Sequence, residues 1–214
     1  MRESIIKAIE ERKVIAIVRG IHGQDCVGLA RALHEGGVDL LEATFDPVDA
    51  SERLRTVATI KALVQNLGGQ MIFGAGTVTT VEMVLQAKNA GAQFIVSPNT
   101  DEKVIRATVG ADMVSIPGAL TPSEIKFAYD CGGDFIKVFP ACSMGVSYFK
   151  NIHAPLSQIR LLAVGGVNEK DAHDYLAAGA VGIGVAGCLF KKEWVHAKEW
   201  EKITLAAKAL MENL

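Results

Sequence analysis

A lysine lies in the middle of an apolar run at residues 134–141, which read DFIKVFPA. Its neighbours are aromatic or β-branched residues that fit a buried strand, and Pro140 ends the run because proline cannot donate a ladder hydrogen bond. Burial of an ammonium costs so much free energy that the group either finds a partner or gives up its proton. Lys137 is therefore a candidate for chemistry that needs a neutral amine.

A carboxylate interrupts a second apolar run, LLEATF at residues 40–45, at Glu42. By strand count Glu42 lies on the second and Lys137 on the sixth of eight predicted strands, and such strands face each other across a barrel. Both groups lie near strand ends, where barrel active sites form. An amine and a carboxylate that meet there suit Schiff-base catalysis on a ketone. A structural salt bridge is the alternative, although a buried ion pair stabilises little.

Other residues that could take part in catalysis or substrate binding also lie at the ends of the predicted strands. They are Arg19, Thr77, Ser97, Pro98, Pro117, Gly165, Gly166 and Gly187. Arg19 could bind a substrate carboxylate through two parallel hydrogen bonds, or could form a surface salt bridge. The glycines could let backbone amides approach a phosphate, or could only permit close helix packing. GIGVAG at residues 182–187 matches a dinucleotide fingerprint, but its glycines lie inside a predicted strand and open no helix.

The composition favours a protein that acts on a small molecule. Half of the 214 residues are hydrophobic, and a net charge of -2 gives no basic surface for nucleic acid or membranes. The first residues lack the apolar core of a signal peptide, and the longest apolar stretch, 177–190, is shorter than the ~20 residues of a membrane helix. We therefore expect a soluble, cytoplasmic protein with no nucleic-acid or membrane partner.

Cysteines and histidines show no spacing typical of metal ligands. The four cysteines form no C-x-x-C pair, which favours reduced thiols over a disulfide framework or a zinc site. The five histidines are scattered as well. We expect neither a metal nor a cofactor.

A recurring unit organises the chain, in which a helix-like stretch ends in Gly-Gly or Gly-Ala and leads into a short apolar strand. It occurs in HEGGVDLLEATF, KNAGAQFIVSP, DCGGDFIKVFP and LAAGAVGIGVAG, and further strands are predicted at 14–20, 71–77, 112–118 and 160–166. Helix-start signals follow most strands: Thr79 or Thr80, Thr100 and Asp101, Thr121, and Asn168. The pattern predicts one (β/α)8 TIM barrel over residues 1–214, with residues 1–12 as an extra N-terminal helix that caps the bottom. A doubly wound sheet is the alternative.

Several motifs resemble, in order and spacing, those of the class I 2-keto-3-deoxy-6-phosphogluconate (KDPG) aldolases, a family that includes 4-hydroxy-2-oxoglutarate (KHG) aldolases. They are IVRG, EATF, GAGTV, FIVSPN, PGALTPSE, KVFP and VGGV, between Val14 and Leu189. In that family the lysine of the K-x-F-P strand forms the Schiff base and the glutamate of the E-x-T strand shuttles protons. The resemblance assigns these roles to Lys137 and Glu42. It also implies that Thr77 and Phe139 line a pyruvate pocket, with Pro98 nearby.

The sequence departs from the family pattern at three positions that concern the substrate. An arginine that helps to bind the carboxylate is replaced by Asp46, the threonine before Gly-Gly by Val164, and a serine near the last strand by Gly187. AVGGV and IVSPN resemble the 6-phosphogalactonate branch of the family, whereas TPSE resembles the gluconate branch.

The resemblance implies a homotrimeric aldolase without a cofactor. Its substrates would be KDPG, KHG or both, cleaved to pyruvate plus glyceraldehyde 3-phosphate or glyoxylate. A 2-dehydro-3-deoxy-6-phosphogalactonate aldolase is the first alternative. A phosphate-binding barrel isomerase with Glu42 as its base is another, and a non-catalytic ligand-binding barrel is a third.

Overall fold

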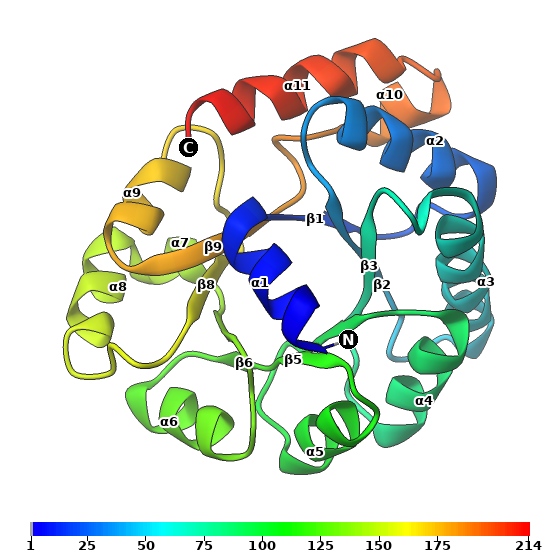
Figure 1. Cartoon of the computed structure of the whole chain (residues 1–214). Helices are drawn as coiled ribbons and strands as arrows, with labels where there is room; N and C mark the ends of the chain where they lie inside the picture. Colours follow the sequence, from blue (N-terminus) through cyan, green and yellow to red (C-terminus); the bar gives the residue numbers. More distant parts are fainter. Residues whose placement is uncertain (1) are drawn as a thin grey trace.

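Short apolar runs form nine parallel strands, and helices alternate with them around a barrel (Figure 1). The computed structural model describes residues 2–214. The strands are β1 (Val14–Val18), β2 (Leu40–Thr44), β3 (Ile72–Gly76), β4 (Phe94–Val96), β5 (Val114–Ile116), β6 (Gly118–Ala119), β7 (Ile136–Val138), β8 (Leu161–Val164) and β9 (Ala180–Val185). The helices are α1 (Arg2–Arg12), α2 (Gly23–Glu35), α3 (Ala50–Leu67), α4 (Val81–Ala90), α5 (Glu102–Gly110), α6 (Pro122–Asp130), α7 (Ala141–Met144), α8 (Val146–His153), α9 (Ala172–Ala177), α10 (Lys192–His196) and α11 (Trp200–Glu212).

The sheet closes through one strand that a proline divides into β5 and β6. These two are the ends of the strand order β5-β4-β3-β2-β1-β9-β8-β7-β6, and only Pro117 separates them along the chain. The Pro117 carbonyl accepts the amide of Lys137 at 2.9 Å, so hydrogen bonding to β7 continues across the break. The eight predicted strands are therefore all present, and the ninth is the second half of the fifth. The predicted (β/α)8 barrel is confirmed.

The interior of the barrel is filled by an apolar cluster distinct from the layer between strands and helices. Leu40, Phe94, Phe135 and other apolar side chains make up this inner cluster, and these three are fully buried. Ile5 and Ile9 of α1 belong to it, and Figure 1 shows α1 lying across the end of the barrel. The predicted N-terminal cap is therefore present from Arg2 onward; Met1 lies outside the described residues.

An ion pair fastens α1 to the barrel. Arg2 donates to both carboxylate oxygens of Asp134, at 3.1 and 2.7 Å. Asp134 also accepts the amide of Ser115 at 2.8 Å, which links the start of β7 to β5. Such a bidentate pair with a mostly buried carboxylate fixes the orientation of the helix.

Most of the predicted helix starts are confirmed. Thr80 and Asp101 accept amides at the first turns of α4 and α5, and Thr121 forms a capping box with Glu124. The prediction at Asn168 is wrong by several residues. Its side chain accepts the amide of Lys170 in a local turn, so α9 begins only at Ala172.

No helix within residues 2–214 combines the length and the apolar character that crossing a bilayer requires.

Candidate active site

The carboxyl ends of the strands surround a cavity of about 560 Å³. It is lined by nine residues that the sequence singled out for catalysis or substrate binding: Arg19, Glu42, Thr77, Pro98, Lys137, Phe139, Gly165, Gly166 and Gly187. Ser97 and Pro117, which the sequence also suggested, do not line it; the Ser97 hydroxyl donates to the carbonyl of Val78 at 2.6 Å. Seven different strand ends thus contribute to one concave surface at the face where barrel enzymes build their active sites. The individual roles of these residues stay predictions.

Lys137 is the middle residue of β7 and points into the barrel, where only 7% of it is exposed. Its Nζ lies 4.7 Å from the centre of the Phe139 ring, so an aromatic wall covers one side of the amine. Burial lowers the pKa of Lys137, the negative charge of Glu42 raises it, and the nearby guanidinium of Arg19 lowers it further. The net shift is downward, which favours the neutral amine.

Glu42 lies on β2, across the barrel from Lys137, and is 3% exposed. The Thr44 hydroxyl donates to its Oε1 at 3.2 Å. Burial raises the pKa of Glu42, while Lys137, the Thr44 hydrogen bond and Arg19 oppose that rise. Within residues 2–214 no direct ion pair joins Glu42 and Lys137, yet both line the cavity. A small substrate can therefore lie between them.

The space for the Glu42 carboxylate comes from a glycine on the neighbouring strand. A Cβ at Gly76 would lie only 1.5 Å from Glu42 Oε1 and 2.1 Å from its Cδ. Two residues earlier on the same face, a Cβ at Gly74 would lie 2.2 Å from the Phe94 ring. Sequence reasoning did not single out Gly76. It could have been found as a small residue at an inward-facing position of β3, the strand that pairs with the strand of Glu42.

Arg19 and Thr77 form the polar edge of the cavity beside Glu42. The guanidinium of Arg19 donates to Thr77 Oγ1 at 2.9 Å, and Arg19 is otherwise exposed. Thr77 has a φ of 55°, a left-handed conformation that is unusual for a β-branched residue. Backbone strain of this kind persists where the surroundings impose it, often at functional sites.

Asp46, at the position of the family arginine, organises its own loop. Its Oδ1 accepts the amides of Val48 and Asp49, both at 2.8 Å. These hydrogen bonds are the main reason why the pKa of Asp46 is lowered. Because Asp46 does not line the large cavity and is itself an anion, it cannot replace the arginine as a partner for a carboxylate.

Two glycine-containing segments, which follow β8 and β9, form one side of the cavity. Gly165 and Gly166 have φ of 95° and 78°, and a Cβ on Gly166 would lie 2.4 Å from Cys142 Sγ. A Cβ on Gly187 would meet nothing within 4 Å. Sequence reasoning missed Asn168 and Glu169, which line this side after β8.

The chain, as far as the structure describes it, holds no group of three His, Cys, Asp or Glu side chains that could bind a metal ion. All four cysteines are free.

Comparisons with known proteins agree with this arrangement. Residues 5–206 match the family model for KDPG and KHG aldolases. A probable 2-dehydro-3-deoxy-6-phosphogalactonate aldolase of Rhizobium meliloti (strain 1021) is 35% identical over 182 residues, 85% of this chain and 83% of that protein. The 2-dehydro-3-deoxy-phosphogluconate aldolase of Treponema pallidum (strain Nichols) is 34% identical over 175 residues, 81% of this chain and 80% of that protein.

Comparison of the structure indicates the same family as comparison of the sequence. A crystal structure of the KDPG aldolase from Legionella pneumophila, with pyruvate captured at low pH as a covalent carbinolamine intermediate, superposes with a TM-score of 0.85 at 27% identity. The match covers 96% of this chain and 97% of that chain. Because the family model spans nearly the whole barrel and curated relatives exceed 30% identity, this chain belongs to the family of KDPG and KHG aldolases.

Proposed function

We propose that this chain is a Schiff-base aldolase that cleaves a 4-hydroxy-2-oxo acid, reversibly, into pyruvate and an aldehyde. The observation that carries the proposal is the burial of Lys137 opposite Glu42 in one cavity, which lowers the pKa of the amine. A desolvated lysine has a larger neutral fraction and can attack a ketone. The carbinolamine in the Legionella relative is the kind of adduct that such an amine forms with pyruvate.

The reaction begins when the neutral Lys137 amine adds to the C2 ketone and gives a carbinolamine, which takes up a proton and loses water to form a protonated imine; the proton is released again when the imine is hydrolysed. Glu42 then accepts the proton of the C4 hydroxyl, directly or through a water, while the C3–C4 bond breaks. The electron pair of that bond moves into the imine and forms an enamine, and the aldehyde leaves. Glu42 returns a proton to C3, and water hydrolyses the imine to release pyruvate.

Arg19 binds the substrate carboxylate in this proposal, in place of the arginine that Asp46 replaces. Its guanidinium borders the cavity beside Glu42 and offers two parallel donors to a carboxylate. Thr77 adds a hydroxyl, and Pro98 and Phe139 add apolar walls around the pyruvate part.

The distal phosphate of a six-carbon substrate would lie against Gly165, Gly166 and Gly187, which line the cavity and carry no side chain that could shield their backbone amides. The substrates we favour are KDPG and KHG. A phosphogalactonate-derived substrate is the second candidate, because AVGGV, which includes the cavity residue Val164, resembles the galactonate branch and a relative at 35% identity carries the galactonate name. Cleavage rates for the two six-carbon phosphates and for KHG separate these possibilities.

Trapping with pyruvate and borohydride tests the mechanism. Wild type should gain one lactyl-sized mass per chain on the peptide that contains Lys137, and Lys137→Met should gain none. The same cleavage rate with and without a chelator is expected for a metal-independent class I enzyme. An adduct on another lysine, or cleavage that proceeds without any adduct, would show that the Schiff-base assignment is wrong.

We further propose that the chain assembles as a homotrimer. Phe127 and Phe139 are 50% and 39% exposed and border a second cavity of about 360 Å³ beside the first. Exposed aromatic surface of this kind is typical of interfaces. Light scattering after gel filtration should give three chain masses, and one chain mass would contradict the proposal.

A further inference from the structure

The loop that carries Arg19 is held in place from a neighbouring helix. Arg19 comes directly after β1, and Gly20 follows with a φ of 69°, so the chain turns sharply at this point. Ile21 and His22 then lead into α2 at Gly23. Arg19 forms no ion pair within residues 2–214, and its side chain is exposed. Its guanidinium is held by the hydrogen bond to Thr77, and the position of its backbone depends on what fixes residues 20–22.

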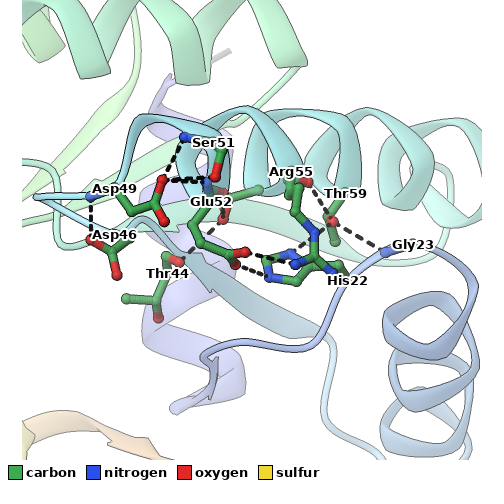
Figure 2. A network of polar contacts seen from close by, with 10 residues as sticks. His22, Gly23, Thr44, Asp46, Asp49, Ser51, Glu52, Arg55 and Thr59 are labelled. Carbon is green, nitrogen blue, oxygen red and sulfur yellow. Dashed lines mark hydrogen bonds and ion pairs between the residues drawn. The ribbon is translucent and has the colours of Figure 1, made fainter.

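His22 is the residue that ties this loop to α3. It occupies the N-cap position of α2, but its side chain does not cap that helix. Its Nε2 instead lies 3.0 Å from Glu52 Oε2, and its Nδ1 lies 3.4 Å from Thr59 Oγ1. Since an ionised carboxylate only accepts, Nε2 carries a hydrogen and donates to Glu52. Figure 2 shows His22 and Gly23 facing Glu52 and Thr59 on α3.

Thr59 supplies the cap that His22 does not. Its hydroxyl accepts the amide of Gly23 at 3.2 Å and donates to the carbonyl of Arg55 at 2.8 Å. The first free amide of α2 is thus satisfied by a buried side chain on another helix, which fixes the start of α2 relative to α3.

Glu52 is itself fixed from two sides. Its Oε1 accepts from the Arg55 guanidinium at 2.6 Å, and its amide lies in the first turn of α3, which the side chain of Asp49 caps. The preceding loop is ordered by Asp46. One polar network therefore joins the loop of Arg19 to the loop between β2 and α3, which contains Asp46 (Figure 2).

Residues of this network lie next to Arg19 and share a small cavity with it. A small cavity of about 80 Å³ is lined by Arg19, His22, Asp46 and Glu52, among others. A displacement of His22 or Glu52 would therefore act on the same few residues that set the direction of the guanidinium.

We propose that His22 and Glu52 are positioning residues, which hold the loop of Arg19 so that its guanidinium faces the substrate carboxylate. The inference rests on the proposed function of Arg19. Loss of the His22–Glu52 contact leaves Lys137 and Glu42 in place but lets the Arg19 guanidinium move. Binding of the substrate and of the transition state is then weakened equally.

The test measures KM, kcat and the inhibition constant of pyruvate for His22→Ala and Glu52→Ala. Both variants should raise KM and the inhibition constant about tenfold with kcat nearly unchanged, as expected when uniform binding is lost. Glu52→Gln keeps an acceptor oxygen for His22 and should lie close to wild type. His34→Ala is the matched control, because His34 lies at the other end of α2 and also contacts a carboxylate, Asp39.

A double variant separates positioning from general support of the fold. In an Arg19→Leu background, His22→Ala should cause no further rise in the inhibition constant, because the group that it positions is gone. The same rise in both backgrounds, or an effect of His34→Ala as large as that of His22→Ala, would overturn the positioning role. If Arg19→Leu alone left the inhibition constant of pyruvate unchanged, Arg19 would not bind the substrate carboxylate, and this inference would be wrong as well. If Arg19→Leu weakened inhibition and neither His22→Ala nor Glu52→Ala did, only the positioning inference would fall.

Discussion

Gly76→Ala should impair catalysis by displacing one carboxylate while the barrel stays folded. The added Cβ would lie 1.5 Å from Glu42 Oε1, whereas ordinary contacts begin at 3.4 Å, so the carboxylate must retreat by about 2 Å. Gly76 does not have a positive φ, so alanine fits its backbone. A misplacement of about 1 Å can cost 10²-fold, and a positioned base contributes about 10²–10⁴-fold, so we expect kcat to fall by about 10²–10⁴-fold.

The assay combines steady-state cleavage with pyruvate trapping by borohydride. Gly76→Ala should still form the adduct on Lys137, because the added methyl meets Glu42 and not the amine. Gly74→Ala is the matched control on the same strand and face. Its Cβ would meet the Phe94 ring in the inner cluster, so it should lower the free energy of unfolding rather than act on Glu42 directly.

Two results would refute this reasoning. Wild-type turnover in Gly76→Ala would mean that the carboxylate is not needed at its present position. Equal losses of adduct formation and cleavage would mean that the substitution disturbs the whole site and not the base alone.

Lys137→Met should unfold with a free energy equal to that of wild type or up to about 4 kcal/mol higher at pH 7, because it removes a buried ammonium and Glu42 can take up a proton. Burial lowers the pKa of Lys137 in the folded state, so this gain should be largest at low pH and vanish as pH rises through the unfolded value of 10.5; a gain that grows with pH in urea titrations would contradict it. Gly187→Val, whose Cβ meets nothing within 4 Å, should raise KM at least tenfold for phosphorylated substrates but not for KHG, and equal changes would remove the phosphate role. Thr77→Asn should raise the free energy of unfolding by about 1 kcal/mol and slow cleavage, because asparagine tolerates the left-handed conformation better; destabilisation would show that the φ of 55° is not strained. Glu42→Gln should shift the pH dependence of pyruvate trapping by cyanoborohydride to lower pH, because the charge of Glu42 raises the pKa of Lys137; a shift to higher pH would exclude that coupling.

The barrel could be predicted from the sequence because its local signals agree with its topology. Glycines after helices, capping residues such as Thr121, and continuous apolar strands all indicate the same alternation. The count of opposite strands then paired Glu42 with Lys137 without any coordinates. The division of the fifth strand at Pro117 was not predicted, since residues 112–118 were expected to form one strand; proline has no amide to donate to the ladder, and the strand breaks there.

The features that could not be predicted depend on the distance between segments far apart in the chain. The space that Gly76 leaves for Glu42 is set by the registry of β2 and β3, which pairs Thr44 with Gly76. The contact of His22 with Glu52 joins positions 30 residues apart, and no periodicity specifies such a contact. A polar side chain at an N-cap position reads as a cap, and only the structure shows that it faces another helix.

The buried groups Lys137 and Glu42 each influence the charge state of the other. Burial moves the pKa of Lys137 down and that of Glu42 up, so each group alone tends to its neutral form, while the charge of the other opposes the shift. The charged pair and the neutral pair therefore lie closer in free energy than they would in water, and their titrations are coupled. The proposed aldol cycle would need such a balance, because in it the amine is neutral when it attacks and the carboxylate first accepts and then returns a proton. In the proposed mechanism the barrel supplies this balance by placing the groups on opposite strands, where each charge shifts the pKa of the other and both side chains line one cavity.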